Sequence, residues 1–159
     1  MAHTFTNAIF HIIFHTKRNS CVMKEEDLSR IFQYIGGIAR EMSGYLYKVG
    51  GRPDHIHLLT PLPITSSLSD FVRIIKTNSS KWIKGLDEAY KEFAWQEGYG
   101  AFSVSESNKH AVMQYIEKQP EHHKNRTSEE EFDMFLAKNG YIRDRQSGII
   151  KKARRMRIG

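Results

Sequence analysis

The stretch YLYKVGGRPDHIHLLT, residues 45–60, places two β-favouring runs on either side of a turn-forming segment. Residues 45–49 and 55–60 are rich in aromatic, β-branched and alternating apolar side chains, which is typical of strands. The five residues between them, 50–54, read GGRPD, a composition that favours a turn. The stretch therefore predicts a β-hairpin, around which the other elements are arranged.

The sequence on either side of this hairpin alternates between strand and helix patterns. Before it, residues 10–16 form a β-branched and aromatic run that predicts a strand, and apolar side chains recur at helical spacing over residues 28–42. After it, residues 68–86 carry the strongest helical stripe in the chain, with a serine before them as N-cap. Residues 101–104 predict a last strand, which gives the order β-α-β-β-α-β.

This order is that of the split βαβ, or ferredoxin-like, fold, an α+β architecture. It predicts an antiparallel sheet with both long helices on one face and the other face open to a ligand or a further helix. A helix predicted over residues 108–119 supplies that added C-terminal element. A short helix over residues 128–137 follows, and regular patterns end after Gly140. We therefore expect one domain over residues 1–140 and a flexible basic tail over residues 141–159.

The positive charge is concentrated in that tail. The chain carries a net charge of +6, with 24 Lys and Arg against 18 Asp and Glu, but seven of the basic residues and one acid follow residue 140. Residues 1–140 therefore have no net charge, so a nucleic-acid partner must be argued from local patches. The single cysteine, Cys21, excludes an internal disulfide and cysteine-rich zinc sites. No apolar run is long enough to span a bilayer and no leader segment is recognisable, so we expect a cytoplasmic protein.

Two histidines stand out in the second strand of the hairpin. Because side chains alternate along a strand, His55 and His57 point to one face, while Ile56 and Leu58 point to the other, toward the core. Two imidazoles fixed on a strand form half of a metal site. The pattern is short, however, and two polar residues on the wet face of a sheet would also produce it. Leu59 excludes a histidine-triad hydrolase, which needs a third histidine at that position.

A tyrosine and a glutamine on the predicted helix over residues 108–119 supply further candidates. Tyr115 and Gln119 lie four residues apart and therefore share a helix face. If this helix crosses the open face of the sheet, the Gln119 amide oxygen can join His55 and His57 around a divalent cation. Two imidazoles and one amide oxygen leave positions open for phosphate and water, which suits Mg²⁺ or Mn²⁺. An ordinary half-buried aromatic residue is the plainer interpretation of Tyr115.

Four segments, in order along the chain, resemble the HUH single-tyrosine transposases of insertion sequences and their REP-associated relatives. The first is PDHIHLL at residues 53–59, which resembles the HUH signature. The others are KTNSSKW at 76–82, WQEGYGAFSVS at 95–105, and YIEKQ at 115–119, leading to a His-His pair. The similarity runs from about residue 5 to residue 140, and the ordered set is far more specific than any one motif.

This resemblance implies roles for individual residues. It implies that His55, His57 and Gln119 bind Mg²⁺ or Mn²⁺, and that Tyr115 attacks the scissile phosphate to leave a 5′-phosphotyrosine. It further implies a transposase that cleaves and rejoins single-stranded DNA at hairpin-bearing element ends, as a homodimer and without ATP. In keeping with this, the chain has no GxxxxGK[ST] nucleotide-binding loop. Pro120 departs from the pattern, because a residue that precedes proline is disfavoured in a helix, and this weakens the assignment of Gln119.

Polar side chains off the apolar stripe of the helix over residues 68–86 are candidates for contacting DNA phosphates, as the resemblance supports: Arg73, Lys76, Asn78, Lys81 and Lys84. Basic residues of the tail can add salt-sensitive, non-specific affinity: Lys151, Lys152, Arg154, Arg155 and Arg157. A solvated helix face and a dispensable tail are the plainer interpretations. Four further histidines are interpreted as structural or surface residues: His11, His15, His122 and His123.

Three other functions are compatible with the same fold. A non-cleaving regulator would bind nucleic acid hairpins without cutting them, since a four-stranded sheet of this topology is also an RNA-binding platform. A domesticated REP-associated enzyme would process scattered genomic repeats, and a metal-dependent phosphodiesterase would use water and leave a free 5′-phosphate. The set of His55, His57 and Tyr115 counts against a pure binding protein, which has no need of it.

Overall fold

A computed structural model describes residues 3, 5–144 and 146–152 of the chain, and these divide into two compact units, Met1–Pro120 and Glu121–Gly159. No helix in these described ranges is long and apolar enough to cross a membrane. The elements, in chain order, are β1 (Ile9–His15), the 3-10 helix η1 (Glu25–Asp27), α1 (Leu28–Ser43), β2 (Lys48–Arg52), β3 (His55–Pro61), α2 (Leu68–Lys84), the 3-10 helix η2 (Glu88–Tyr90), β4 (Gly100–Val104), α3 (Lys109–Glu117), α4 (Gln119–His122), α5 (Ser128–Lys138), β5 (Tyr141–Arg143) and β6 (Ile150–Lys152).

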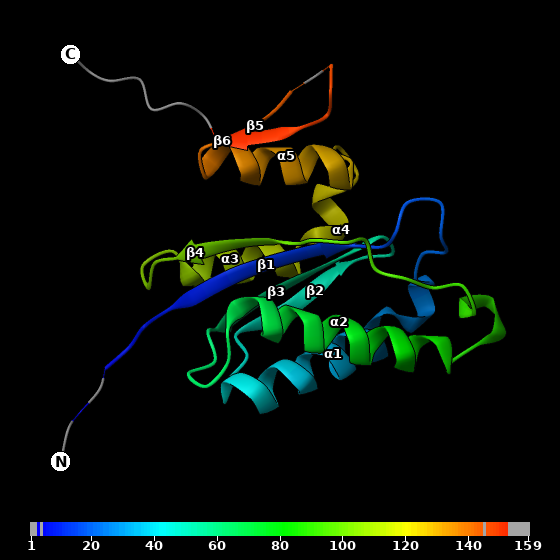
Figure 1. The fold of residues 1–159 in the computed structure, drawn as a ribbon, viewed down its shortest axis with the longest axis horizontal. Coiled ribbons are helices and arrows are strands. Elements are labelled where there is room, and N and C mark those ends of the chain that lie inside the picture. The colour runs from blue at the N-terminus through cyan, green and yellow to red at the C-terminus, as the bar shows by residue number, and fades with distance from the viewer. Residues whose placement is uncertain (1–2, 4, 145, 153–159) are drawn as a thin grey trace. The chain divides into compact units, whose positions relative to one another are not determined.

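The first unit is built on a four-stranded antiparallel sheet. Its strand order is β2-β3-β1-β4, so β1 lies between β3 and β4, and β2 forms one edge. The long helices α1 and α2 cover one face of the sheet, and α3 lies on the other (Figure 1). The predicted α+β fold is confirmed, with its β-α-β-β-α-β order, both long helices on one face, and an added helix that carries the tyrosine.

Alternation of side chains along β3 gives the sheet two different faces. Ile56 and Leu58 are fully buried and pack with α1 and α2 in the main core. Leu59 points the other way and joins Ile9 of β1 and Ile116 of α3 in a smaller apolar cluster. Because side chains two residues apart in a strand point the same way, both histidines of β3 share the face of Leu59 and α3. This direction is the one that the sequence predicted.

The hairpin differs from its prediction at its first strand. The sequence predicted a strand over residues 45–49 and a turn over residues 50–54, but β2 includes Gly50 and Gly51. Only Pro53 and Asp54 separate β2 from β3. The predicted boundaries were therefore wrong, because glycine was taken as a sign of a turn when here it belongs to a strand.

Both glycines of β2 are explained by the close approach of other backbone. A Cβ atom on Gly51 would lie 2.2 Å from the carbonyl oxygen of His55. A Cβ atom on Gly50 would lie 2.8 Å from Cγ2 and 3.0 Å from the carbonyl oxygen of Ile116. Glycine at these two positions lets β3 fold back tightly and lets α3 lie directly on β2.

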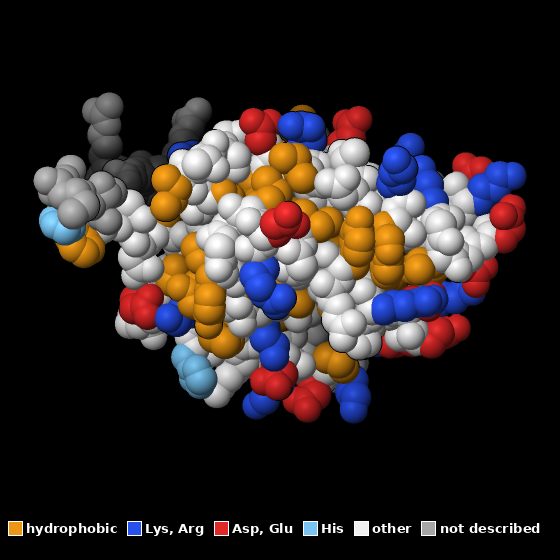
Figure 2. Space-filling model, turned by 90° about the horizontal axis from the view of Figure 1, so that it is seen from below, with side chains coloured by type: hydrophobic (Ala, Val, Ile, Leu, Met, Phe, Trp, Pro, Cys, Tyr) orange, Lys and Arg blue, Asp and Glu red, His pale blue; other side chains and the backbone are white. Residues whose placement is uncertain are grey.

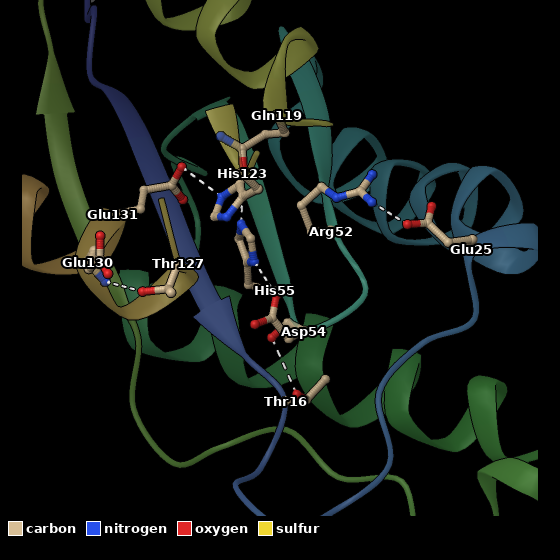
Figure 3. A network of polar contacts seen from close by, with 10 residues as sticks. All are labelled: Thr16, Glu25, Arg52, Asp54, His55, Gln119, His123, Thr127, Glu130 and Glu131. Carbon is tan, nitrogen blue, oxygen red and sulfur yellow. Dashed lines mark hydrogen bonds and ion pairs between the residues drawn. The ribbon is translucent and has the colours of Figure 1, made fainter. Parts of the chain in front are cut away.

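The segment that follows β1 holds the turn before β3 in place. The backbone amide of Thr16 donates a hydrogen bond of 2.9 Å to the carbonyl oxygen of Asp54. On the other side of the turn, Arg52 forms an ion pair with Glu25 of η1 (Figure 3). The turn is thus fixed from two directions, and so is the start of β3.

The second unit contains the end of α4, the helix α5 and a short hairpin. Thr127 caps α5 by accepting a hydrogen bond from the amide of Glu130, at 3.1 Å. β5 pairs with β6, and Arg143 of β5 donates a 2.8 Å hydrogen bond to Asp133 of α5. β5 and β6 lie within residues 141–159, the predicted tail, and they pair as a hairpin in the same compact unit as α5. The remaining tail residues named above lie outside the described residues: Arg154, Arg155 and Arg157.

Candidate active site

His55 and His57 lie side by side on β3, and both side chains are fully buried. Their ring centroids are 5.0 Å apart, with the ring planes at 75°. Each ring offers one nitrogen, and these two atoms are within 4.8 Å of one another. A rigid strand therefore holds two imidazole nitrogens at a separation that one cation can bridge.

His55 is held between two oxygen-bearing side chains, Asp54 and Gln119 (Figure 3). Its Nδ1 is 2.7 Å from Oδ1 of Asp54, and its Nε2 is 2.9 Å from Oε1 of Gln119. The carboxylate can only accept, so Nδ1 donates to it, and the Asp54 carboxylate orients the ring. Nε2 of His55 and Oε1 of Gln119 thus lie next to each other on this face of the sheet. An imidazole nitrogen and an amide oxygen are ligand atoms that suit Mg²⁺ or Mn²⁺.

The Gln119 side chain reaches His55 although the helix breaks just before it. α3 ends at Glu117, and its C-cap, Lys118, has φ −92° and ψ 18°, outside the helical region. A new short helix, α4, begins at Gln119. The break that Pro120 predicts is therefore present, and it falls one residue before the predicted ligand.

Tyr115 approaches His57 from α3. Its ring centroid is 6.1 Å from that of His57, with the ring planes at 72°. The next residue, Ile116, is 1% exposed and packs over Gly50 of β2, so apolar contact fixes the helix on the sheet. Tyr115 and both histidines of β3 thus come together within one unit of one chain.

Two further histidines lie against this pair, which the sequence analysis did not anticipate. β1 pairs with β3 so that His15 lies opposite His55 and Ile13 opposite His57, with His11 two residues further along the same face. Nε2 of His11 is 2.7 Å from Nδ1 of His57, and the rings of His15 and His55 stack with centroids 5.5 Å apart. His11 and His15 are four residues apart on one strand and therefore share a face, but the register of β1 on β3 was not available from sequence.

The predicted DNA-contacting residues lie on α2, across the sheet from the histidine pair. Asn78, Lys81 and Lys84 are exposed, and Arg73 forms a 3.4 Å ion pair with Asp70. On the face that carries α1 and α2, Lys and Arg side chains are interspersed with Asp and Glu (Figure 2). The structure therefore does not bring these residues together with the histidines, and their contact with DNA stays a prediction.

Lys76 differs from the other predicted DNA contacts because its ammonium group is engaged by the backbone. Its Nζ donates hydrogen bonds to the carbonyl oxygens of Gln96, at 2.6 Å, and Gly98, at 2.7 Å. Burial lowers the pKa of this ammonium group. Lys76 thus ties α2 to the segment that leads into β4, and its contacts are those of a structural residue.

In the second unit, His123 has a carboxylate partner. Its Nε2 is 3.1 Å from Oε2 of Glu131 on α5 (Figure 3), whereas the sequence favoured surface positions for His122 and His123. The sequence did not indicate Glu131 as a partner for a histidine, since it is one of three consecutive acidic residues at the start of α5.

Comparisons with known proteins found a matching family model and similar solved structures. The family model described as "Transposase IS200 like" matches residues 4–119. Among solved structures, the chain is similar to a candidate transposase from Deinococcus radiodurans R1, with 24% identity and a TM-score of 0.55 over 75% of this chain and 96% of that one. It is also similar to a REP-associated tyrosine transposase bound to a REP hairpin, with 16% identity and a TM-score of 0.53 over 77% and 74% of the two chains. No curated protein matches the chain. At these identities, the likeness to the two structures concerns the fold.

Proposed function

Since this chain belongs to the IS200-like transposase family, we propose that it cleaves and rejoins single-stranded DNA at hairpin-bearing ends through Tyr115. The observation that carries this proposal is the position of Tyr115, whose ring centroid is 6.1 Å from that of His57. This tyrosine, a potential nucleophile, lies beside two histidines on one strand. One of these histidines faces an amide oxygen, so side chains that can ligate a metal lie next to the tyrosine. A REP-associated tyrosine transposase of similar fold was solved with a DNA hairpin, which supports hairpin DNA as the substrate to test.

We assign His55, His57 and Gln119 as the residues that hold a divalent cation. The close approach of Nε2 of His55 and Oε1 of Gln119, 2.9 Å apart, supports this set, and a nitrogen and an oxygen ligand suit Mg²⁺ or Mn²⁺. When bound, such a cation acts as a Lewis acid that stabilises negative charge on the scissile phosphate.

Tyr115 is assigned as the nucleophile. Its phenolic oxygen forms a bond to phosphorus, and the bond from phosphorus to the 3′ oxygen of the preceding nucleotide breaks. Tyr115 loses its phenolic proton and the departing 3′ oxygen takes up a proton, which leaves a 5′-phosphotyrosine and a free 3′-hydroxyl group. Attack by a 3′-hydroxyl group on the phosphotyrosine reverses these bond changes, so rejoining consumes no ATP.

The direct test uses single-stranded DNA that carries a hairpin-bearing element end and a label at its 3′ end. Because the tyrosine stays on the 5′ phosphate of the downstream piece, we expect the label in a protein band that resists denaturation. This band should form with Mg²⁺ or Mn²⁺ and disappear when EDTA removes the metal. Absence of an adduct across a broad set of hairpin-bearing ends contradicts the proposal. Tight hairpin binding without cutting would instead favour a regulator, and a free 5′-phosphate without adduct a water-using phosphodiesterase.

We also propose that each subunit completes its own site. The family resemblance implies a homodimer, in which the tyrosine helix of one subunit can serve the other. Here the proximity of Tyr115 and His57 within one chain favours assembly in cis. A mixture of His57→Ala and Tyr115→Phe proteins should therefore form no more adduct than either variant alone. Wild-type protein mixed with each variant separately is the control for the effect of mixing on adduct yield. An adduct that appears when the two variants are mixed with each other would establish assembly in trans.

A further inference from the structure

The contact between His11 and His57 joins two buried imidazoles from neighbouring strands. Nε2 of His11 lies 2.7 Å from Nδ1 of His57, and the two residues are 2% and 0% exposed. Their rings stack with centroids 5.0 Å apart and planes at 25°. β1 and β3 are the two central strands of the sheet, so each is paired with a neighbouring strand on both sides.

A hydrogen bond between two imidazole nitrogens requires one to donate and the other to accept. A neutral imidazole carries one N–H group and one lone pair, so a proton on Nδ1 leaves the lone pair on Nε2. If His57 donates from Nδ1, His11 accepts at Nε2 and carries its own proton on Nδ1. The Nε2 atom of His57 then has the lone pair that a metal ligand needs.

We infer that His11 is a positioning residue that holds His57 in the tautomer with the proton on Nδ1, and so presents Nε2 to a divalent cation. This inference rests on the proposed metal site. His55 has a corresponding partner in Asp54, which accepts from its Nδ1 at 2.7 Å. The two histidines of β3 are therefore oriented by different groups, a carboxylate from the turn and an imidazole from the adjacent strand.

Three substitutions in β1 separate this role from simple packing. His11→Leu removes the acceptor, whereas His11→Gln can keep one, since the Gln amide oxygen reaches about as far as Nε2 of histidine. Ile13→Val is the matched control, because Ile13 lies opposite His57 in the sheet, is 1% exposed, and has no polar side-chain atom. Circular dichroism and thermal melting establish that each variant is folded.

Metal affinity is the first readout, measured as the Kd for Mn²⁺ by titration calorimetry on metal-free protein. Loss of a group that orients a ligand histidine weakens metal binding by about 10-fold to 100-fold. We expect this for His11→Leu, a Kd within a few-fold of wild type for His11→Gln, and no change for Ile13→Val. Equal affinity in folded His11→Leu and wild type, or a Gln variant as weak as the Leu variant, overturns the role of His11.

The tautomer itself is the second readout, because it is visible by nitrogen NMR of ¹⁵N-histidine-labelled, metal-free protein. We expect His57 to carry its proton on Nδ1 in the wild type and to lose this preference in His11→Leu. A His57 protonated on Nε2 in the wild type contradicts the inference whatever the activity. His57→Ala separates the two proposals: if it leaves Mn²⁺ binding unchanged, the metal site fails. If it abolishes binding and His11→Leu does not weaken it, only the positioning role fails.

Discussion

Replacement of Tyr115 by phenylalanine is expected to abolish the covalent protein–DNA adduct while leaving the fold and hairpin binding intact. The change removes only the phenolic oxygen, and the ring stays beside His57, 6.1 Å between centroids. Removal of a covalent nucleophile typically lowers the rate by about 10⁴-fold or more, since no neighbouring group can form the same bond. The yield of labelled adduct measures the reaction, and fluorescence anisotropy with a labelled hairpin measures binding.

Tyr47→Phe is the matched control for this experiment. Tyr47 packs against the same apolar cluster as Ile116, so its substitution also removes one hydroxyl group near α3. We expect Tyr47→Phe to form adduct at close to the wild-type rate. An adduct that survives in Tyr115→Phe assigns the nucleophile to another residue, and equal loss in both variants indicates a general effect of altered packing.

Gly51→Ala is expected to lower the free energy of unfolding by about 3 kcal/mol, the largest stability effect of a single methyl group in the hairpin. The new Cβ atom would lie 2.2 Å from the carbonyl oxygen of His55, and φ of 154° is unfavourable for a residue with a side chain. Relief requires movement of the His55 backbone. Because His55 would be displaced, the protein that remains folded should also form less adduct than the wild type.

Gly37→Ala is the control for Gly51→Ala. Gly37 lies within α1, and a Cβ atom there would have no neighbour within 4 Å. Alanine is favoured over glycine in a helix by up to about 1 kcal/mol, so this variant should be as stable as the wild type or more so. Urea unfolding gives both values. Equal stability of Gly51→Ala and the wild type contradicts the close pairing of β2 and β3 at this turn.

The sequence was sufficient where a local pattern determines the outcome. Alternation along a strand correctly placed His55 and His57 opposite Ile56 and Leu58, and the apolar stripe of residues 68–86 correctly predicted α2. Both patterns depend on neighbours a few residues away, whose effect is the same in almost any fold.

The sequence was insufficient where contacts join distant segments. His11 lies 46 residues before His57, and their contact depends on the register of β1 against β3. The place of Lys76 on α2 likewise did not indicate its hydrogen bonds to carbonyl groups 20 and 22 residues later. Gly50 was assigned to a turn from its local composition, and the helix that packs over it comes 66 residues later in the chain.

The missing side chain at Gly50 also has an evolutionary consequence. Because a Cβ atom on Gly50 would lie 2.8 Å from Cγ2 and 3.0 Å from the carbonyl oxygen of Ile116, the absence of a side chain there sets how closely α3 approaches β2, the strand paired with the histidine-bearing β3. A spacing fixed in this way tolerates drift in the surrounding side chains, provided that the glycine is kept. Descendants of such a protein can therefore lose most of their recognisable sequence and still hold the helix that carries the tyrosine at the same distance from the sheet.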